Sequence, residues 1–130
     1  MFIRNKTRAE KRDRKGLISY FLLERGDAGQ DELAVTWVYI APGKKQPLHS
    51  HAEQQVYVVI EGHGVVHVDE DSQSVKSGDL IYIPSNAVHG MENTGDTPLS
   101  YISAASPAFD LRQVYDRGPL SADSYEESDS

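Results

Sequence analysis

Short apolar runs separated by turn residues are the feature that most constrains the fold of this chain. The runs are rich in Val, Ile and Tyr, which favour β-strands, and the segments between them are rich in Gly, Pro, Asn, Asp and Ser, which favour turns. No interval shows a sustained helical period of 3.6 residues. Short strands at this spacing predict an all-β sandwich or barrel, most commonly a jelly roll. The expected strands cover residues 17–24, 33–40, 55–60, 65–68, 80–83 and 99–103.

The composition indicates one domain without sulfur chemistry. At 130 residues the chain has the size of a single domain, and no internal repeat suggests a second barrel. No apolar run is long enough to cross a bilayer, and the charged start lacks the apolar stretch of a signal peptide. We therefore expect a cytoplasmic protein without a membrane partner. Cysteine is absent, so any metal must be held by nitrogen and oxygen atoms.

The net charge of −7 is unevenly distributed along the chain. Residues 1–16 contain seven Lys or Arg against Glu10 and Asp13, and we expect a solvated basic leader there. Nucleic-acid binding is not expected, because no aromatic residues interleave with these charges and the acidic remainder would repel phosphate. Residues 118–130 end in a run of Asp, Glu and Ser, which predicts an acidic disordered tail. The predicted barrel covers residues 17–117.

His49 and His51 are separated by one residue, and this spacing predicts a metal site. Successive side chains on a strand point to opposite faces, so these two histidines would share a face. Imidazoles about 7 Å apart on one face can reach the same ion, provided that other ligands complete its shell. Gln55 and His89 are the candidates for the remaining positions.

Two longer patterns contain these residues. Residues 43–62 read GKKQPLHSHAEQQVYVVIEG, and residues 78–93 read GDLIYIPSNAVHGMEN. They resemble the two conserved motifs of the cupins, and the 15 residues between them match the spacing of small microbial single-domain cupins. The resemblance implies a double-stranded β-helix, or jelly-roll barrel, that binds one divalent transition metal. It places the metal ligands at His49, His51, Gln55 and His89.

The chain departs from the cupin pattern at two positions. Asn86 replaces a usual Gly, which is a mild change because Asn tolerates the left-handed backbone of a tight turn. Gln55 replaces the usual Glu ligand, but its carbonyl oxygen can bind a metal, and a subset of cupins uses a His, His, Gln, His set. Glu53 shares the strand parity of His51 and is the competing ligand, although its spacing to Gly62 differs from the motif.

A ligand set of three imidazoles and one amide carries no charge, so a divalent ion would keep its full charge. Nickel, zinc, iron, manganese and copper are all compatible with these ligands. Unit charges about 4 Å apart interact by about 4 kcal/mol at an effective dielectric constant near 20, so the centre should attract a small anion. It favours Lewis-acid chemistry such as isomerisation or ring opening over easy redox cycling. Dioxygen chemistry on a bound enolate stays open.

Tyr57 is the candidate catalytic residue. It lies two residues beyond Gln55, so its ring should line the cavity beneath the metal. Its hydroxyl could orient a substrate or act as an acid, or the ring could simply pack in the barrel. Lys44 and Lys45 precede His49 and could steer an anion or simply be solvated.

Other aromatic and histidine side chains are expected to face outward. Trp37 and Tyr39 alternate with aliphatic residues, and Tyr82 does the same further along the chain. Exposed aromatic residues on a strand usually mark a protein partner, so we expect a homodimer joined through Trp37 and Tyr39. His63 and His67 have the parity opposite to their aliphatic neighbours and are interpreted as surface residues.

Three functions are compatible with these features. The first is an enzyme acting on a small oxygen-rich anion, as a sugar-acid isomerase or lyase or as an enolate dioxygenase. Its predicted ligand set resembles that of cupins acting on unsaturated uronates from pectin and alginate. The second is a non-catalytic protein that binds a metal and a small ligand. The third is a structural cupin of the storage-protein kind, which is disfavoured because the ligand set is intact.

Overall fold

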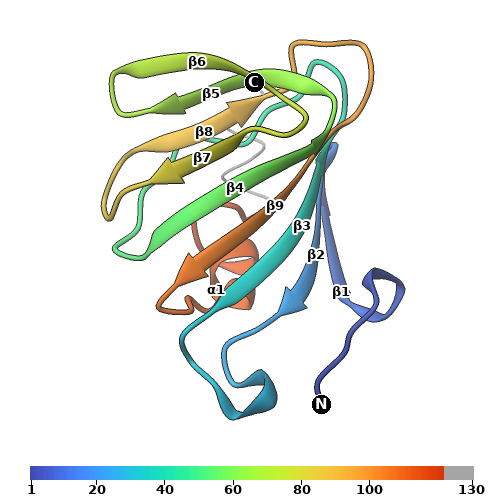
Figure 1. Cartoon of the computed structure of the whole chain (residues 1–130), viewed down its shortest axis with the longest axis vertical. Coiled ribbons are helices and arrows are strands. Elements are labelled where there is room, and N and C mark those ends of the chain that lie inside the picture. Colours follow the sequence, from blue (N-terminus) through green and yellow to red (C-terminus); the bar gives the residue numbers. More distant parts are fainter. Residues whose placement is uncertain (122–130) are drawn as a thin grey trace.

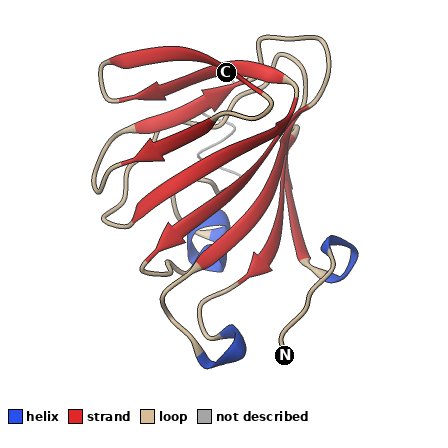
Figure 2. Ribbon diagram, viewed as in Figure 1, coloured by secondary structure: helices blue, strands red, loops and turns tan. Residues whose placement is uncertain are grey.

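Two antiparallel β-sheets form the protein, and the computed structural model describes residues 1–121 (Figure 1). The larger sheet has the strand order β1-β2-β3-β9-β4-β7, and the smaller sheet has the order β6-β5-β8. The larger sheet contains β1 (Glu10–Arg14), β2 (Leu17–Leu23), β3 (Ala34–Ile40), β9 (Leu99–Ser106), β4 (Gln54–Glu61) and β7 (Leu80–Ile83). The smaller sheet contains β6 (Asp71–Lys76), β5 (His63–Val68) and β8 (His89–Glu92). The predicted all-β jelly roll is confirmed (Figure 2).

Alternating burial explains why most of these segments form strands. In β3, Ala34, Thr36, Val38 and Ile40 are buried, whereas the residues between them are partly exposed. Such alternation places one face of a strand on a core. All six expected strands are present. The strands that the sequence did not predict, β1, β6 and β8, are short and mostly polar; β1 reads EKRDR and β6 reads DSQSVK.

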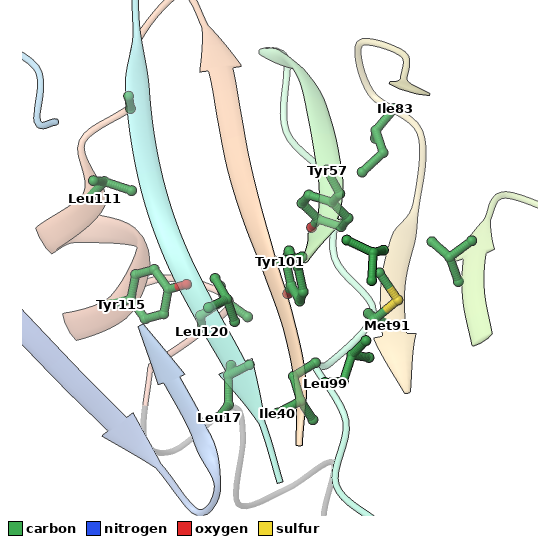
Figure 3. Close-up of a cluster of buried hydrophobic side chains, with 14 of the residues drawn as sticks. Leu17, Ile40, Tyr57, Ile83, Met91, Leu99, Tyr101, Leu111, Tyr115 and Leu120 are labelled. Carbon is green, nitrogen blue, oxygen red and sulfur yellow. The ribbon is translucent and has the colours of Figure 1, made fainter. Parts of the chain in front are cut away.

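The core lies between the sheets and against the C-terminal helix α1 (Leu111–Asp116), as Figure 3 shows. Tyr57 and Tyr101 are fully buried in its centre, with ring centroids 4.6 Å apart. Leu111, Tyr115 and Leu120 of the C-terminal segment pack into the same core. Burial of one such side chain contributes about 1.5–3 kcal/mol to folding.

Much of the segment 1–16, expected as a solvated leader, contacts the barrel, although Met1 and Ile3 are exposed. β1 pairs with β2 along its whole length. Arg12 Nε lies 2.8 Å from Asp116 Oδ1, and Arg14 Nη2 lies 3.3 Å from the same oxygen. The basic residues therefore join the first strand to α1, a contact between residues about a hundred positions apart that local composition does not reveal.

The C-terminal segment folds back onto the barrel as well. α1 begins after Asp110, whose Oδ1 accepts a hydrogen bond from the backbone N–H of Gln113 at 3.3 Å. Six residues are too few to show a helical period in the sequence. Leu120 is 3% exposed, so folded structure continues past the expected boundary at Gly118. Residues 122–130 of the predicted tail lie outside the described residues.

Two short 3₁₀ turns, η1 (Lys6–Arg8) and η2 (Asp27–Gly29), complete the described elements. Within residues 1–121, none of the helices has the length and apolarity needed to span a membrane.

Trp37 and Tyr39 lie on the outer face of β3, with ring centroids 6.1 Å apart. Lys6 of η1 covers them, with its Nζ 4.5 Å from the Trp37 centroid and 4.7 Å from the Tyr39 centroid. The ammonium also donates a hydrogen bond to the Tyr39 hydroxyl. Cation–π contacts of this kind are worth about 0.5–1 kcal/mol at exposed sites. The N-terminal segment thus occupies part of the surface expected to join a homodimer, and the homodimer stays a prediction.

Two asparagines fix the loops of the second motif. Asn86 has a φ of +68°, the left-handed conformation expected of a residue replacing Gly. Asn93 is 2% exposed, and its amide donates to the carbonyl oxygens of Ile40 and Thr97 at 2.8 Å each. Its side-chain oxygen accepts from the N–H of Gly95 at 2.9 Å. Asn93 therefore joins the β8–β9 loop to the end of β3.

Candidate metal centre

Backbone hydrogen bonds hold together the segments that carry the three histidines. His49 and His89 face each other in an isolated antiparallel bridge, with N–O distances of 3.0 and 2.8 Å. The carbonyl oxygen of His51 accepts from the N–H of Asn86 at 2.8 Å. Residues 49–51 form an extended loop rather than the predicted strand. The rings of His49 and His51 are nevertheless neighbours, with centroids 5.7 Å apart.

One ring nitrogen of each histidine is fixed by a main-chain carbonyl group. The Nδ1 atoms of His49, His51 and His89 lie 2.8, 2.8 and 2.9 Å from the carbonyl oxygens of Pro47, Glu53 and Ala87. A carbonyl oxygen can only accept, so each Nδ1 carries the proton and each Nε2 presents a lone pair. Proteins commonly orient imidazole ligands toward a metal in this way.

The three rings converge on one point. Ligand atoms of His49, His51 and His89 all lie within 4.8 Å of one another. Nε2 of His89 is buried and has no hydrogen-bond partner among the described residues. Leaving a buried acceptor unpaired costs about 1–3 kcal/mol, and a bound cation would remove that cost. The cluster could therefore hold a divalent metal.

Burial keeps two of these imidazoles neutral. His49 is 9% exposed and His89 is fully buried. Burial, reinforced by the repulsion that two protonated rings at His49 and His89 would feel, lowers the pKa of His49 from 6.5 to about 3. Burial also lowers the pKa of His89 to about 4, against the opposing hydrogen bond to Ala87. Both rings are unprotonated at neutral pH, as a metal ligand must be.

Gln55 extends from β4 to the same cluster. Its amide nitrogen donates to Ser103 Oγ at 2.6 Å, and its Oε1 lies 3.1 Å from His51 Nε2. Gln55 Oε1 and His51 Nε2 both present lone pairs, which repel each other at this distance. A cation bound between these two atoms would replace that repulsion with two attractive contacts. The carboxylate of Glu53 lies 3.9 Å from His51 Nδ1, the nitrogen already bound to a carbonyl group. The structure thus brings Gln55, rather than the competing Glu53, to the available nitrogen.

Tyr57 lies beside the cluster, with its ring centroid 6.2 Å from that of His89. Its hydroxyl donates to Gln46 Oε1 at 3.2 Å, and burial raises its pKa. A catalytic role for Tyr57 stays a prediction. Gln46 and Ser103, which bind Tyr57 and Gln55, were not predicted. The parity of Ser103 along its strand could have indicated that it faces inward, whereas no sequence signal marks Gln46.

The outward histidines lie away from the cluster. His63 is exposed at the start of β5. His67 lies 2.7 Å from Ser72 Oγ and 3.2 Å from Glu92 Oε1 through its two ring nitrogens. Tyr82 is 53% exposed. These positions agree with the parity argument.

A small chamber adjoins the cluster inside the barrel. Its volume is about 20 Å³, room for roughly one water molecule. The C-terminal segment closes it with the side chains of Phe109, Leu111, Val114, Tyr115 and Leu120. This closure is anchored by the Tyr115 hydroxyl, which lies 2.7 Å from Ser19 Oγ.

The sequence pattern of the cupin domain family matches residues 36–105, more than half of the chain. The chain belongs to the cupin family. The matched segment runs from β3 to β9 and contains His49, His51, Gln55 and His89. The predicted family is therefore confirmed.

Three curated relatives match this cupin over about half of its length. An uncharacterized protein of Methanocaldococcus jannaschii is 37% identical over 68 residues, which are 52% of this chain and 54% of that protein. An oxalate-binding protein of Thermotoga maritima is 34% identical over 65 residues, which are 49% of this chain and 54% of that protein. A gentisate 1,2-dioxygenase of Streptomyces is 35% identical over 65 residues, only 18% of its own length. The matched segment thus spans about half of each of the first two relatives.

Solved structures share the fold over nearly their whole length. An RmlC-like cupin from Shewanella frigidimarina has a TM-score of 0.71 and 25% identity, covering 83% of this chain and 92% of that chain. A predicted oxalate decarboxylase from Thermotoga maritima also has a TM-score of 0.71 and 25% identity, covering 82% of this chain and 99% of that chain. The similarity therefore extends beyond the segment that the family pattern matches.

Proposed function

We propose that this cupin binds one divalent transition metal through Nε2 of His49, His51 and His89 and through the amide oxygen of Gln55. The observation that carries the proposal is that all three Nδ1 atoms lie within hydrogen-bond distance of main-chain carbonyl oxygens, which leaves only Nε2 to bind a ligand. The unpartnered Nε2 of His89 supports it, because a cation would satisfy that buried lone pair.

At this centre we propose that the protein acts on a small oxygen-rich anion, as a sugar-acid isomerase or lyase or as an enolate dioxygenase. The four proposed ligand groups are neutral, so they leave the charge of a divalent ion available to an anion. A bound metal would supply Lewis-acid polarisation of a substrate oxygen. The relatives described as an oxalate-binding protein and a gentisate 1,2-dioxygenase support a ligand of this class.

Tyr57 is proposed to present a neutral hydroxyl to the substrate. Burial raises its pKa, so the phenol keeps its proton at neutral pH. Tyr57→Phe should lower turnover while metal content and anion affinity stay unchanged. Unchanged turnover would assign Tyr57 to packing alone.

A non-catalytic protein that binds a metal and a small ligand is the second candidate. The observation that favours it is the closed chamber, since about 20 Å³ does not admit a substrate unless the covering side chains move. Anion binding without turnover of any tested sugar acid or enolate would support this candidate.

The proposal is tested by elemental analysis of protein purified without a metal-affinity tag and supplied with nickel, zinc, iron, manganese or copper in turn. About one metal ion per chain is expected with at least one of them. Protein that retains none of these ions would contradict the proposal.

Gln55→Glu separates the two enzymatic readings. An anionic oxygen at this position should increase metal affinity but lower the affinity for oxalate, because the charge of the site falls by one. Turnover should fall if the reaction depends on Lewis acidity, and rise if it depends on metal oxidation. Gln54→Glu is the matched control, because Gln54 is the exposed neighbour on the same strand. If Gln55→Glu changes neither metal nor oxalate affinity, residue 55 is not a ligand, and Glu53→Gln becomes the variant to measure.

A further inference from the structure

A second, larger cavity adjoins the chamber on its outer side. This outer cleft has a volume of about 460 Å³ and shares His51, Phe109 and Val114 with the chamber. The ring of Phe109 packs edge-on against His51, with centroids 5.1 Å apart. Two hydrophobic side chains and one candidate ligand therefore line both cavities.

The two cavities differ in size, and the size of each limits what it can bind. The chamber holds about one water molecule, whereas the outer cleft falls within the range of about 300–1,000 Å³ typical of small-molecule sites. An anion could reach the metal centre only if side chains that close the chamber, such as Phe109 and Val114, move aside, and only its reacting end would fit there. The rest of such a molecule would have to lie in the outer cleft.

The walls of the outer cleft are polar and slightly acidic. Glu53, Asp110 and Gln113 contribute oxygen acceptors, and Arg25 contributes a guanidinium group. Arg25 Nη2 lies 3.4 Å from Asp110 Oδ2, so its charge is already balanced by that carboxylate. One uncompensated carboxylate, that of Glu53, leaves the charged lining with a net charge of −1. Such walls suit hydroxyl groups, which donate to carboxylates and accept from a guanidinium.

We propose that the outer cleft binds the hydroxylated tail of a monocarboxylate whose carboxylate lies at the metal centre. The proposal rests on the proposed function, because it takes the centre to be the binding site of the carboxylate. Glu53 and Asp110 accept hydrogen bonds from tail hydroxyls, and Arg25 and Gln113 donate to them. A second carboxylate on the tail would be repelled by the acidic wall of the cleft. A hydrocarbon tail would leave the polar groups of that wall without hydrogen-bond partners.

Calorimetry on the metal-loaded protein with three probes tests this assignment. Gluconate has a hydroxylated tail, hexanoate has a hydrocarbon tail, and glucarate carries a second carboxylate at the far end. Gluconate should bind about tenfold more tightly than either of the others, since one or two net hydrogen bonds supply that difference. Equal affinity for gluconate and hexanoate would overturn the proposal.

Variants of the cleft make the test specific. Glu53→Gln should reduce the preference for gluconate over glucarate at least threefold, because the wall loses its negative charge. Asp110→Asn should do the same while retaining a side chain that can begin α1. Asp96→Asn, which removes one charge from the β8–β9 loop, is the control and should leave both affinities unchanged. Equal effects of all three variants would show that net charge alone is responsible and would overturn the assignment.

Failure of this inference and failure of the proposed function give different results. Metal content is measured on each sample before the titrations. Full metal content with no preference among the probes overturns the outer-cleft assignment alone. Absence of metal overturns the proposed function, and with it the premise of this inference.

Discussion

The histidine-bearing segments and the two terminal segments of residues 1–121 are held to the barrel by different kinds of contact. The histidine segments use main-chain hydrogen bonds, in the bridge between His49 and His89 and from each Nδ1 to a carbonyl group two residues away. The ends use side chains from distant parts of the sequence, such as Tyr115 with Ser19 and Arg12 with Asp116. The geometry of the proposed metal centre therefore depends on short motifs. The cover over it, formed by Phe109, Leu111, Val114, Tyr115 and Leu120, depends on contacts between the two terminal segments of residues 1–121.

The largest expected effect is the loss of stability when a side chain of the cover is truncated. Leu120→Ala should lower the free energy of unfolding by about 2–5 kcal/mol, because Leu120 is 3% exposed and its removal leaves a cavity. Metal affinity should change little, since no candidate ligand is held by Leu120. Chemical denaturation and metal titration measure the two quantities. Leu80→Ala is the control, because Leu80 is 62% exposed and should cost less than about 0.5 kcal/mol. A large loss of metal affinity in Leu120→Ala would mean that cover and centre are not separate.

Acidification should lower the free energy of unfolding of the metal-free protein, because it affects the buried histidines of the proposed centre. Burial lowers the pKa of His49 to about 3 and of His89 to about 4, so below about pH 6.5 the unfolded chain binds protons that the folded chain does not. The free energy of unfolding is therefore unaffected by these two rings above about pH 6.5. As the pH is lowered below that value, it decreases by about 1.4 kcal/mol per pH unit for each ring.

Urea unfolding of metal-free protein at about pH 7 and about pH 5 measures this dependence. His89→Gln should remove about half of it, since one of the two rings is lost. Equal stability of the wild type at both pH values would contradict the burial of two neutral imidazoles.

His89→Ala should reduce metal affinity about tenfold or more, because it removes the one proposed ligand that lies in the second motif. His67→Ala is the matched control, since His67 lies on the outer face of β5 and should have little effect. Competition with a metal chelator gives both affinities. Equal losses in the two variants would place the centre elsewhere.

The smallest expected effect is that of one ion pair between the ends. Arg12→Gln should lower the free energy of unfolding by about 0.2–1 kcal/mol, because Arg12 and Asp116 are partly exposed. The difference from the wild type should shrink in high salt, which screens such pairs. A difference that salt does not change would indicate that packing of the Arg12 stem, rather than its charge, holds α1.

The difference between local contacts and contacts of residues far apart in the chain also explains what could be predicted from the sequence. Strands with alternating burial, such as β3, were predicted because hydrophobic periodicity is a local signal. The four residues expected at the metal centre come together because the motif spacings fix them. The strand β1, the helix α1 and the burial of Leu120 were not predicted, because polar strands and six-residue helices show no periodicity. The outer cleft could not be predicted either, since Arg25, Glu53 and Asp110 approach one another only in the folded chain.

X-ray absorption spectroscopy of the zinc-loaded protein tests the proposed three-histidine centre, because it counts the imidazole groups bound to the metal. We expect about one zinc ion per chain, with three imidazole nitrogens at about 2.0–2.1 Å and an additional oxygen ligand. In His89→Ala the count should fall to two imidazoles. A spectrum with fewer than three imidazoles in the wild type, or the same count in wild type and His89→Ala, would contradict the proposed centre.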